Sequence, residues 1–261
     1  MDLPPEIRNQ IYSYLFHPHR VQIKRRKLTT PRPQYRLSHE QLAPRDPKTQ
    51  SLACRPHKSQ SQYSTQLALP FVSRQSYIDT ICLLYACTQF VFATPKCLSR
   101  FLEKTPKQTR QVIQQIEISH TMYNEPHLYK NREFKLRGDR NWYSLCERVV
   151  TNFTALKAVY VDLEVFDCLI RLEVGEAWSL PVLAFRRVKG QKSNGCESSG
   201  LDFAKIRLRS RQFPRGEVSR VEKQLEKEVM GPVAVQVAED EKKARILANL
   251  KATKVLSLVF N

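Results

Sequence analysis

The sequence is poor in glycine, with seven in 261 residues. Glycine-rich loops cradle phosphates in many nucleotide-binding sites, and the one lookalike here, residues 190–195, is followed by Cys196 and Glu197 instead of Lys and Ser or Thr. Neither Gly-x-Gly-x-x-Gly nor Gly-x-Ser-x-Gly occurs, and His39-Glu40 lacks the second histidine that a zincin needs. We therefore predict a protein that is not an enzyme and that binds no cofactor and no metal ion.

Long apolar runs and paired cysteines are also missing. No run of eighteen apolar residues occurs, and the chain opens on a helix signal rather than a secretory leader. The seven cysteines are an odd number without a Cys-x-x-Cys, which is typical of reduced thiols. We expect an intracellular protein, nuclear or cytoplasmic, that does not associate with membranes. Cys82 and Cys87 lie on and just after an apolar helix, so we expect them to pack in the core.

Acidic residues are scarce: 25 Asp and Glu stand against 43 Lys and Arg, which gives a net charge of +18. Half of this excess lies in residues 17–66, where eleven Lys or Arg face only Glu40 and Asp46, a net charge of +9. The same stretch holds six prolines and lacks the apolar periodicity that would offset chain entropy. We predict a mobile basic insertion at about residues 17–66. Its expected regular structure is a short strand with Val21 and Ile23 and a return strand with Tyr35 and Leu37.

The first sixteen residues pair a helix start with an apolar stripe. Pro4 and Pro5 suit a first helical turn, where a missing N–H costs nothing, and Glu6 complements the helix dipole there. Apolar side chains then recur at i, i+4, i+7 and i+8 and share one face. These residues are Ile7, Ile11, Tyr14 and Leu15. That face needs a partner, which is either the chain's own core or a second protein.

Helix and strand patterns alternate through the rest of the chain. Thr94-Pro95 and Thr105-Pro106 are two helix starts in a dozen residues, and each combines a capping hydroxyl with a first-turn proline. Helices are predicted within 70–85, from Thr94, from Thr105 to about 113, around 142–150, and at 217–230 and 239–250. Strands are predicted at 89–93, 115–118, 158–163, 201–209 and 255–260. This alternation predicts an α+β (mixed α/β) fold, in which amphipathic helices cover a layered sheet.

Three blocks resemble the F-box-like proteins that are numerous in filamentous fungi. They are LPPEIRNQIY at 3–12, FVSRQSYIDTICLLY at 71–85 and QFVFA at 89–93, with Asp79 where that family more often has Glu. The resemblance implies an F-box-like region over 1–120 with an amino-terminal helical part, and a helix and strand layer over 121–261 packed on it as one unit. It also implies a protein-interaction module that recruits targets to a cullin-based ubiquitin ligase through a Skp-type adaptor. The implied adaptor-binding residues are Leu3, Pro4, Ile7, Ile11 and Leu15.

Two basic clusters support an alternative function. They consist of Lys24, Arg25, Arg26 and Lys27, and of Lys205, Arg207, Arg209 and Arg211. The first is typical of a nuclear import address or an anion-binding patch. The second alternates with Ile206 and Leu208, so a strand there would place its cations in a row on one face. The alternative is therefore a basic nuclear protein that binds nucleic acid through phosphates, without sequence specificity.

Overall fold

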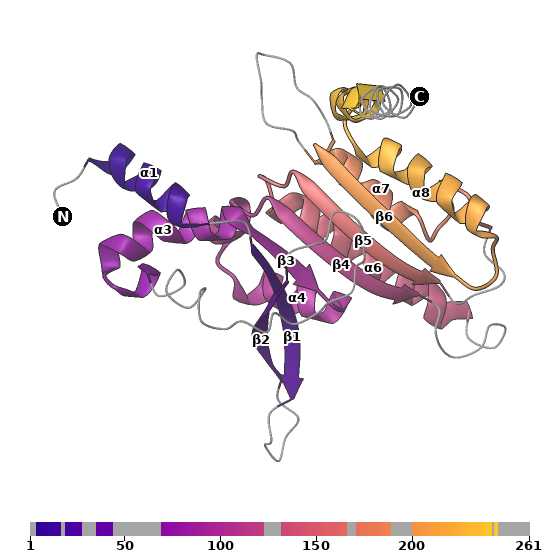
Figure 1. Cartoon of the computed structure of the whole chain (residues 1–261). Coiled ribbons are helices and arrows are strands. Elements are labelled where there is room, and N and C mark those ends of the chain that lie inside the picture. The colour runs from indigo at the N-terminus through magenta and orange to yellow at the C-terminus, as the bar shows by residue number, and fades with distance from the viewer. Residues whose placement is uncertain are drawn as a thin grey trace, which may run out of the picture.

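The computed structural model describes residues 4–16, 19–27, 35–43, 69–122, 132–165, 171–188, 200–241 and 243–244. At its centre is a six-stranded sheet in the order β2-β1-β3-β4-β5-β6 (Figure 1). The strands are β1 (His19–Lys27), β2 (Tyr35–Leu42), β3 (Thr88–Phe92), β4 (Gln115–Met122), β5 (Ala158–Val165) and β6 (Phe203–Ser210). β1 and β2 are antiparallel, and the other neighbours pair in parallel. The predicted α+β fold is confirmed.

Helices connect the parallel strands, as such pairings require. They are α1 (Pro5–Leu15), α3 (Arg74–Cys87), α4 (Pro95–Lys104), α5 (Lys107–Gln111), α6 (Arg132–Asn152), α7 (Leu180–Leu183) and α8 (Arg215–Val229), with short 3₁₀ turns η1 (Leu69–Phe71) and η2 (Ala184–Arg187). A further helical segment begins at Pro232, earlier than the predicted 239, and the predicted strand at 255–260 lies outside the described residues. Within the described part of the chain, no helix has the length and apolar character needed to cross a membrane.

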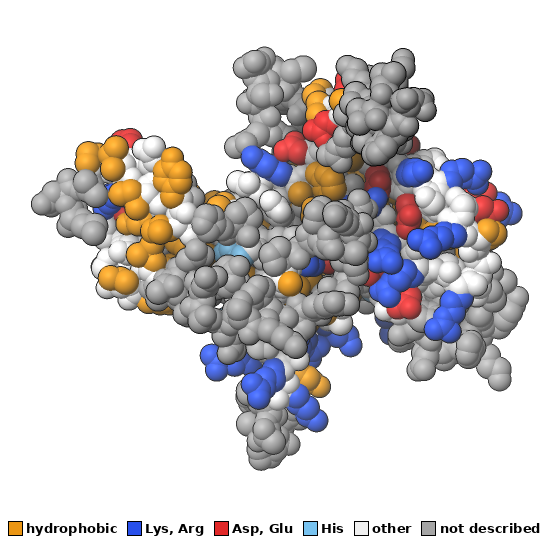
Figure 2. Space-filling model, in the orientation of Figure 1, with side chains coloured by type: hydrophobic (Ala, Val, Ile, Leu, Met, Phe, Trp, Pro, Cys, Tyr) orange, Lys and Arg blue, Asp and Glu red, His pale blue; other side chains and the backbone are white. Residues whose placement is uncertain are grey.

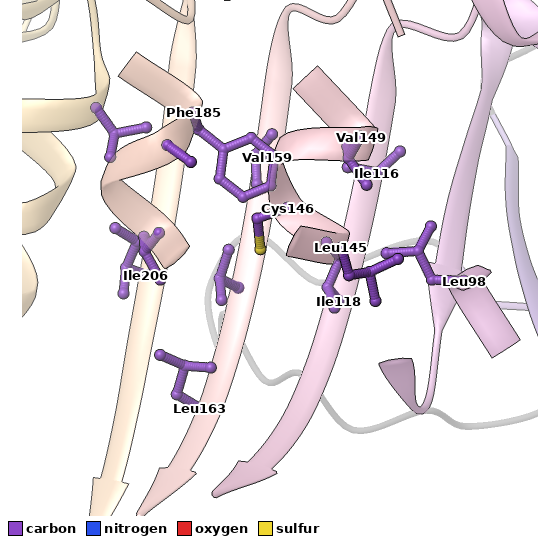
Figure 3. Close-up of a cluster of buried hydrophobic side chains, with 14 of the residues drawn as sticks. Leu98, Ile116, Ile118, Leu145, Cys146, Val149, Val159, Leu163, Phe185 and Ile206 are labelled. Atoms are coloured by element: carbon purple, nitrogen blue, oxygen red, sulfur yellow. The ribbon is translucent and has the colours of Figure 1, made fainter. Parts of the chain in front are cut away.

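The main core lies between the sheet and α4, α6 and α7 (Figure 3). α4 starts where the sequence predicts, because the Thr94 hydroxyl accepts a hydrogen bond from the Cys97 amide. Alternate strand residues meet the helices, and their neighbours in sequence point to the opposite face. The strands contribute Phe90, Phe92, Ile116, Ile118, Val159, Val161, Leu163, Ile206 and Leu208, and the helices contribute Leu98, Phe101, Leu102, Trp142, Leu145, Cys146, Val149, Val182 and Phe185.

β6 is an edge strand whose outer side is covered by α8. The predicted alternation is confirmed, since Ile206 and Leu208 are buried on the core side. Glu226 accepts a hydrogen bond from the Ile206 amide at 3.0 Å, and Glu222 accepts one from the Leu208 amide at 2.7 Å. Two backbone N–H groups that would be open to another strand are thereby bonded within the chain.

Within the predicted insertion, the expected strand with Val21 and Ile23 and the return strand with Tyr35 and Leu37 are confirmed as the hairpin of β1 and β2. Residues 19–27 and 35–42 form two full strands of the sheet, longer than the short strands expected around Val21 and Tyr35. The beginning of β1 is joined to β4 by an ion pair: Arg20 Nη2 lies 2.8 Å from Glu117 Oε2, and both side chains are almost fully buried. Gln89, on β3 between them, donates to the same carboxylate oxygen at 3.3 Å. Residues 28–34 and 44–66 lie outside the described residues.

The expected division of the chain at residue 120 falls inside β4. Strands from both sides of that position belong to the same sheet, and their side chains fill the same core. The two predicted regions therefore share their central structure.

Candidate partner-binding surface

Helices α1 and α3 form an arm that projects from one end of the sheet (Figure 1). Although the hairpin separates them in sequence, they pack on each other. Arg8 Nη1 of α1 lies 3.1 Å from Asp79 Oδ2 of α3, and both side chains are largely buried. Gln75 Nε2 donates to the other Asp79 oxygen at 2.8 Å. Asp79 thus joins two of the three blocks that carry the F-box-like resemblance, those at 3–12 and 71–85.

α1 turns its apolar stripe away from this contact. Tyr12 and Phe16 are buried, whereas Ile7, Ile11 and Leu15 are 44%, 43% and 42% exposed. The stripe is therefore not packed in the chain's own core, which was one of the two outcomes that the sequence left open. Pro4 is exposed next to it, and Leu3 lies outside the described residues.

Further exposed apolar side chains come from η1 and α3. Phe71 at the end of η1 and Val72, which precedes the Ser73 N-cap of α3, are 82% and 73% exposed. We call the combined surface the apolar arm surface. It consists of Ile7, Ile11, Tyr14, Leu15, Phe71, Val72, Tyr77 and Ile78. Figure 2 shows hydrophobic side chains gathered over α1 and α3. Sequence reasoning missed its second half, since the apolar residues of 70–85 suggested only a buried helix.

The chemistry of the apolar arm surface suits a protein partner. Monomeric proteins rarely expose large contiguous apolar patches outside interaction sites. Burying an apolar side chain such as Leu or Phe releases about 1.5–3 kcal/mol when burial is complete. The nearby charges of Arg8 and Asp79 already neutralise each other within the arm. A partner can therefore cover this surface without a further desolvation cost for that ion pair.

Residues 1–179 match the family model described as "Domain of unknown function (DUF7730)". The chain belongs to this family. No curated protein and no solved structure matches the chain. The DUF7730 span contains the arm, the hairpin and the strands through β5, whereas β6 and α8 lie beyond it.

The two basic clusters lie on different strands and do not form one surface. Residues 24–27 belong to β1 within the DUF7730 span, whereas 205–209 belong to β6, and β3, β4 and β5 separate the two strands. In the first cluster, Lys24 pairs with Glu40 and the Arg25 guanidinium lies 4.0 Å from the centre of the Tyr35 ring. Arg26 and Lys27 are exposed.

Acidic neighbours offset much of the charge in the second cluster. Arg209 makes a two-pronged contact with Asp162 at 3.0 and 2.8 Å, and Lys205 lies 3.1 Å from Glu226. Arg207 and Arg211 are exposed. Three cations of the predicted row, Lys205, Arg207 and Arg209, lie on β6, and Arg211 lies just beyond the end of the strand. As a surface for phosphates the row is weaker than the sequence suggested.

One of the two cysteines that were expected to pack in the core is exposed. Cys82 is exposed on α3, which corrects the expectation that it packs in the core, and Cys87 is half-buried. Cys97 and Cys146 are buried instead, and burial raises the pKa of the Cys146 thiol well above its usual value. Among the residues that the structure describes, no three His, Cys, Asp or Glu side chains are grouped as metal ligands.

Proposed function

We propose that this chain is a non-enzymatic protein-interaction module of the F-box-like kind. Its apolar arm surface docks a Skp-type adaptor, and the rest of the molecule presents a target to a cullin-based ubiquitin ligase. The observation that carries the proposal is the exposure of Ile7, Ile11 and Leu15 on a helix that is otherwise packed against its neighbour. The F-box-like resemblance supplies the identity of the partner.

The proposed mechanism is bridging. The arm lies at one end of the sheet and is set apart from the main core, so an adaptor on it leaves the sheet and its hairpin accessible (Figure 1). The contact between Arg8 and Asp79 holds α1 in a fixed position on α3. The docking surface is therefore preorganised, which reduces the entropy lost on binding.

Co-purification of a Skp-type adaptor with the full chain tests this function. Ile7→Asp and Ile11→Asp together place two charges where apolar contacts would form, so we expect adaptor recovery to fall at least tenfold. The matched control is Val233→Asp with Val237→Asp, which likewise replaces two exposed β-branched residues by Asp at i, i+4 spacing, on the helical segment that begins at Pro232. Val233 and Val237 are 65% and 52% exposed. The control is expected to retain the adaptor.

Circular dichroism of both double variants must match the wild type, because the four substituted side chains are exposed. Failure of the wild-type chain to recover any Skp-type adaptor contradicts the proposal. Equal loss of the adaptor in both double variants contradicts the assignment to the arm.

A further inference from the structure

The far half of the hairpin extends beyond the rest of the sheet. The β1–β3 ladder ends where Ile23 pairs with Phe92, and from Lys24 onward β1 pairs only with β2 among the described strands. We call residues 24–27 and 35–38 the basic ribbon. It projects from the sheet as a two-stranded element (Figure 1). No third described strand pairs with the ribbon, and Leu37 is its side chain that packs against the main core. The ribbon therefore depends largely on the pairing of β1 with β2 for its stability.

Both faces of the basic ribbon carry cations. Successive strand residues alternate between faces, and the register pairs Arg26 with Arg36. One face therefore carries Lys24, Arg26 and Arg36, and the other carries Arg25 and Lys27. The ribbon contains no acidic residue, and the nearest one, Glu40, pairs with Lys24. Figure 2 shows Lys and Arg side chains gathered around this projection.

The pairing of Arg26 with Arg36 is unfavourable without an anion. Like charges directly opposite each other on an antiparallel pair destabilise it by a few tenths of a kcal/mol to about 1 kcal/mol. Both side chains are exposed, so neither contributes to the core. A bound anion between the guanidinium groups reverses the sign of this interaction.

We propose that the basic ribbon binds duplex DNA by entering its major groove. An acidic peptide lying along one face or one edge meets only some of the cations, whereas a groove has phosphates on both walls and so meets both faces. The major groove, about 12 Å wide, admits a two-stranded β-ribbon. The cations contact phosphates, so the binding is indifferent to sequence. This site is independent of the apolar arm surface and of the function proposed for it.

The salt dependence of binding to a fluorescent DNA duplex tests the ribbon. Each phosphate contact contributes about −0.9 to the slope of log affinity against log salt. Arg26→Gln with Arg36→Gln therefore makes the slope shallower by about 1.8, which corresponds to an affinity loss between 50 and 200 mM salt that is about 12-fold smaller than in the wild type. The control, Arg220→Gln with Lys223→Gln, removes the same charge from exposed positions on α8 and is expected to keep the wild-type slope.

Urea unfolding shows whether a change in the slope comes from lost binding or from lost folding. The ribbon variant should be at least as stable as the wild type, because the substitutions remove a like-charge pair. The proposal is overturned if the ribbon variant keeps the wild-type slope. It is also overturned if the α8 control changes the slope equally, since the attraction is then diffuse. Binding of a polyglutamate peptide with no measurable binding of duplex overturns it as well, and assigns the ribbon to an acidic protein.

Discussion

His120 shows how burial sets the chemistry of a single side chain. It lies on β4 with its ring centre 4.7 Å from that of Trp142 on α6, inside the layer of helices that covers the sheet. This burial lowers the pKa of the His120 imidazole from 6.5 to about 4. The imidazole is therefore neutral at pH 7 and serves in packing.

The lowered pKa of His120 predicts a loss of stability in mild acid. The unfolded chain binds a proton at about pH 6.5 and the folded chain only near pH 4, so the stabilisation is complete above pH 6.5 and is lost as the pH falls towards 4. Between pH 7.5 and 5 the free energy of unfolding should drop by about 2 kcal/mol through this residue. Urea unfolding at both values is expected to show that drop in the wild type and not in His120→Gln.

His39, exposed on β2, provides the control for that experiment. His39→Gln is expected to keep the pH dependence of the wild type. A wild-type drop that survives unchanged in His120→Gln contradicts the assignment to His120.

Among the elements, α8 has two roles, because one of its faces fills the core and its carboxylates bond the edge of β6. Glu222→Ala removes the acceptor of the Leu208 amide, a charged hydrogen bond of 2.7 Å. We expect a loss of about 2 kcal/mol in the free energy of unfolding, measured in urea. Glu222→Gln keeps an acceptor oxygen and should cost less.

Lys223→Ala, at the next and exposed position of α8, is the matched control and should change stability by less than about 0.5 kcal/mol. If Glu222→Ala is as neutral as Lys223→Ala, the carboxylate does not protect the edge of β6.

The sequence predicted those elements whose signals are local. Thr94-Pro95 marked the start of α4, and the alternation around Ile206 marked β6. β1 was predicted too short, because its outer residues are cations without apolar alternation and depend on pairing with β2. The exposure of Cys82 was also unpredictable, since α3 carries apolar residues on several sides and only its position in the arm decides which are covered.

At the scale of the whole molecule, contacts between distant segments determine which apolar faces are covered and which charges are paired. The local sequence pattern does not contain this information. The sequence left open whether the stripe of Ile7 faces the core or a partner, because Tyr12 and Phe16 form a second apolar face beside it. Arg209 pairs with Asp162, 47 residues away in the sequence. This contact reduces the positive charge that the β6 cations offer to phosphates. The arm and the basic ribbon both project from the sheet as a result, one with an apolar surface and one with a cationic surface.

Hydrogen–deuterium exchange of the full chain, with and without a purified Skp-type adaptor, tests most directly the claim that the apolar arm surface is a docking site. The adaptor should slow exchange in residues 5–15 and 69–87, because docking covers α1, η1 and α3. Exchange in the buried strands β4 and β5 should not change, since these strands already lie inside the sheet. An adaptor that binds but leaves 5–15 and 69–87 at their free exchange rates, or that forms no complex with the wild-type chain, contradicts the claim.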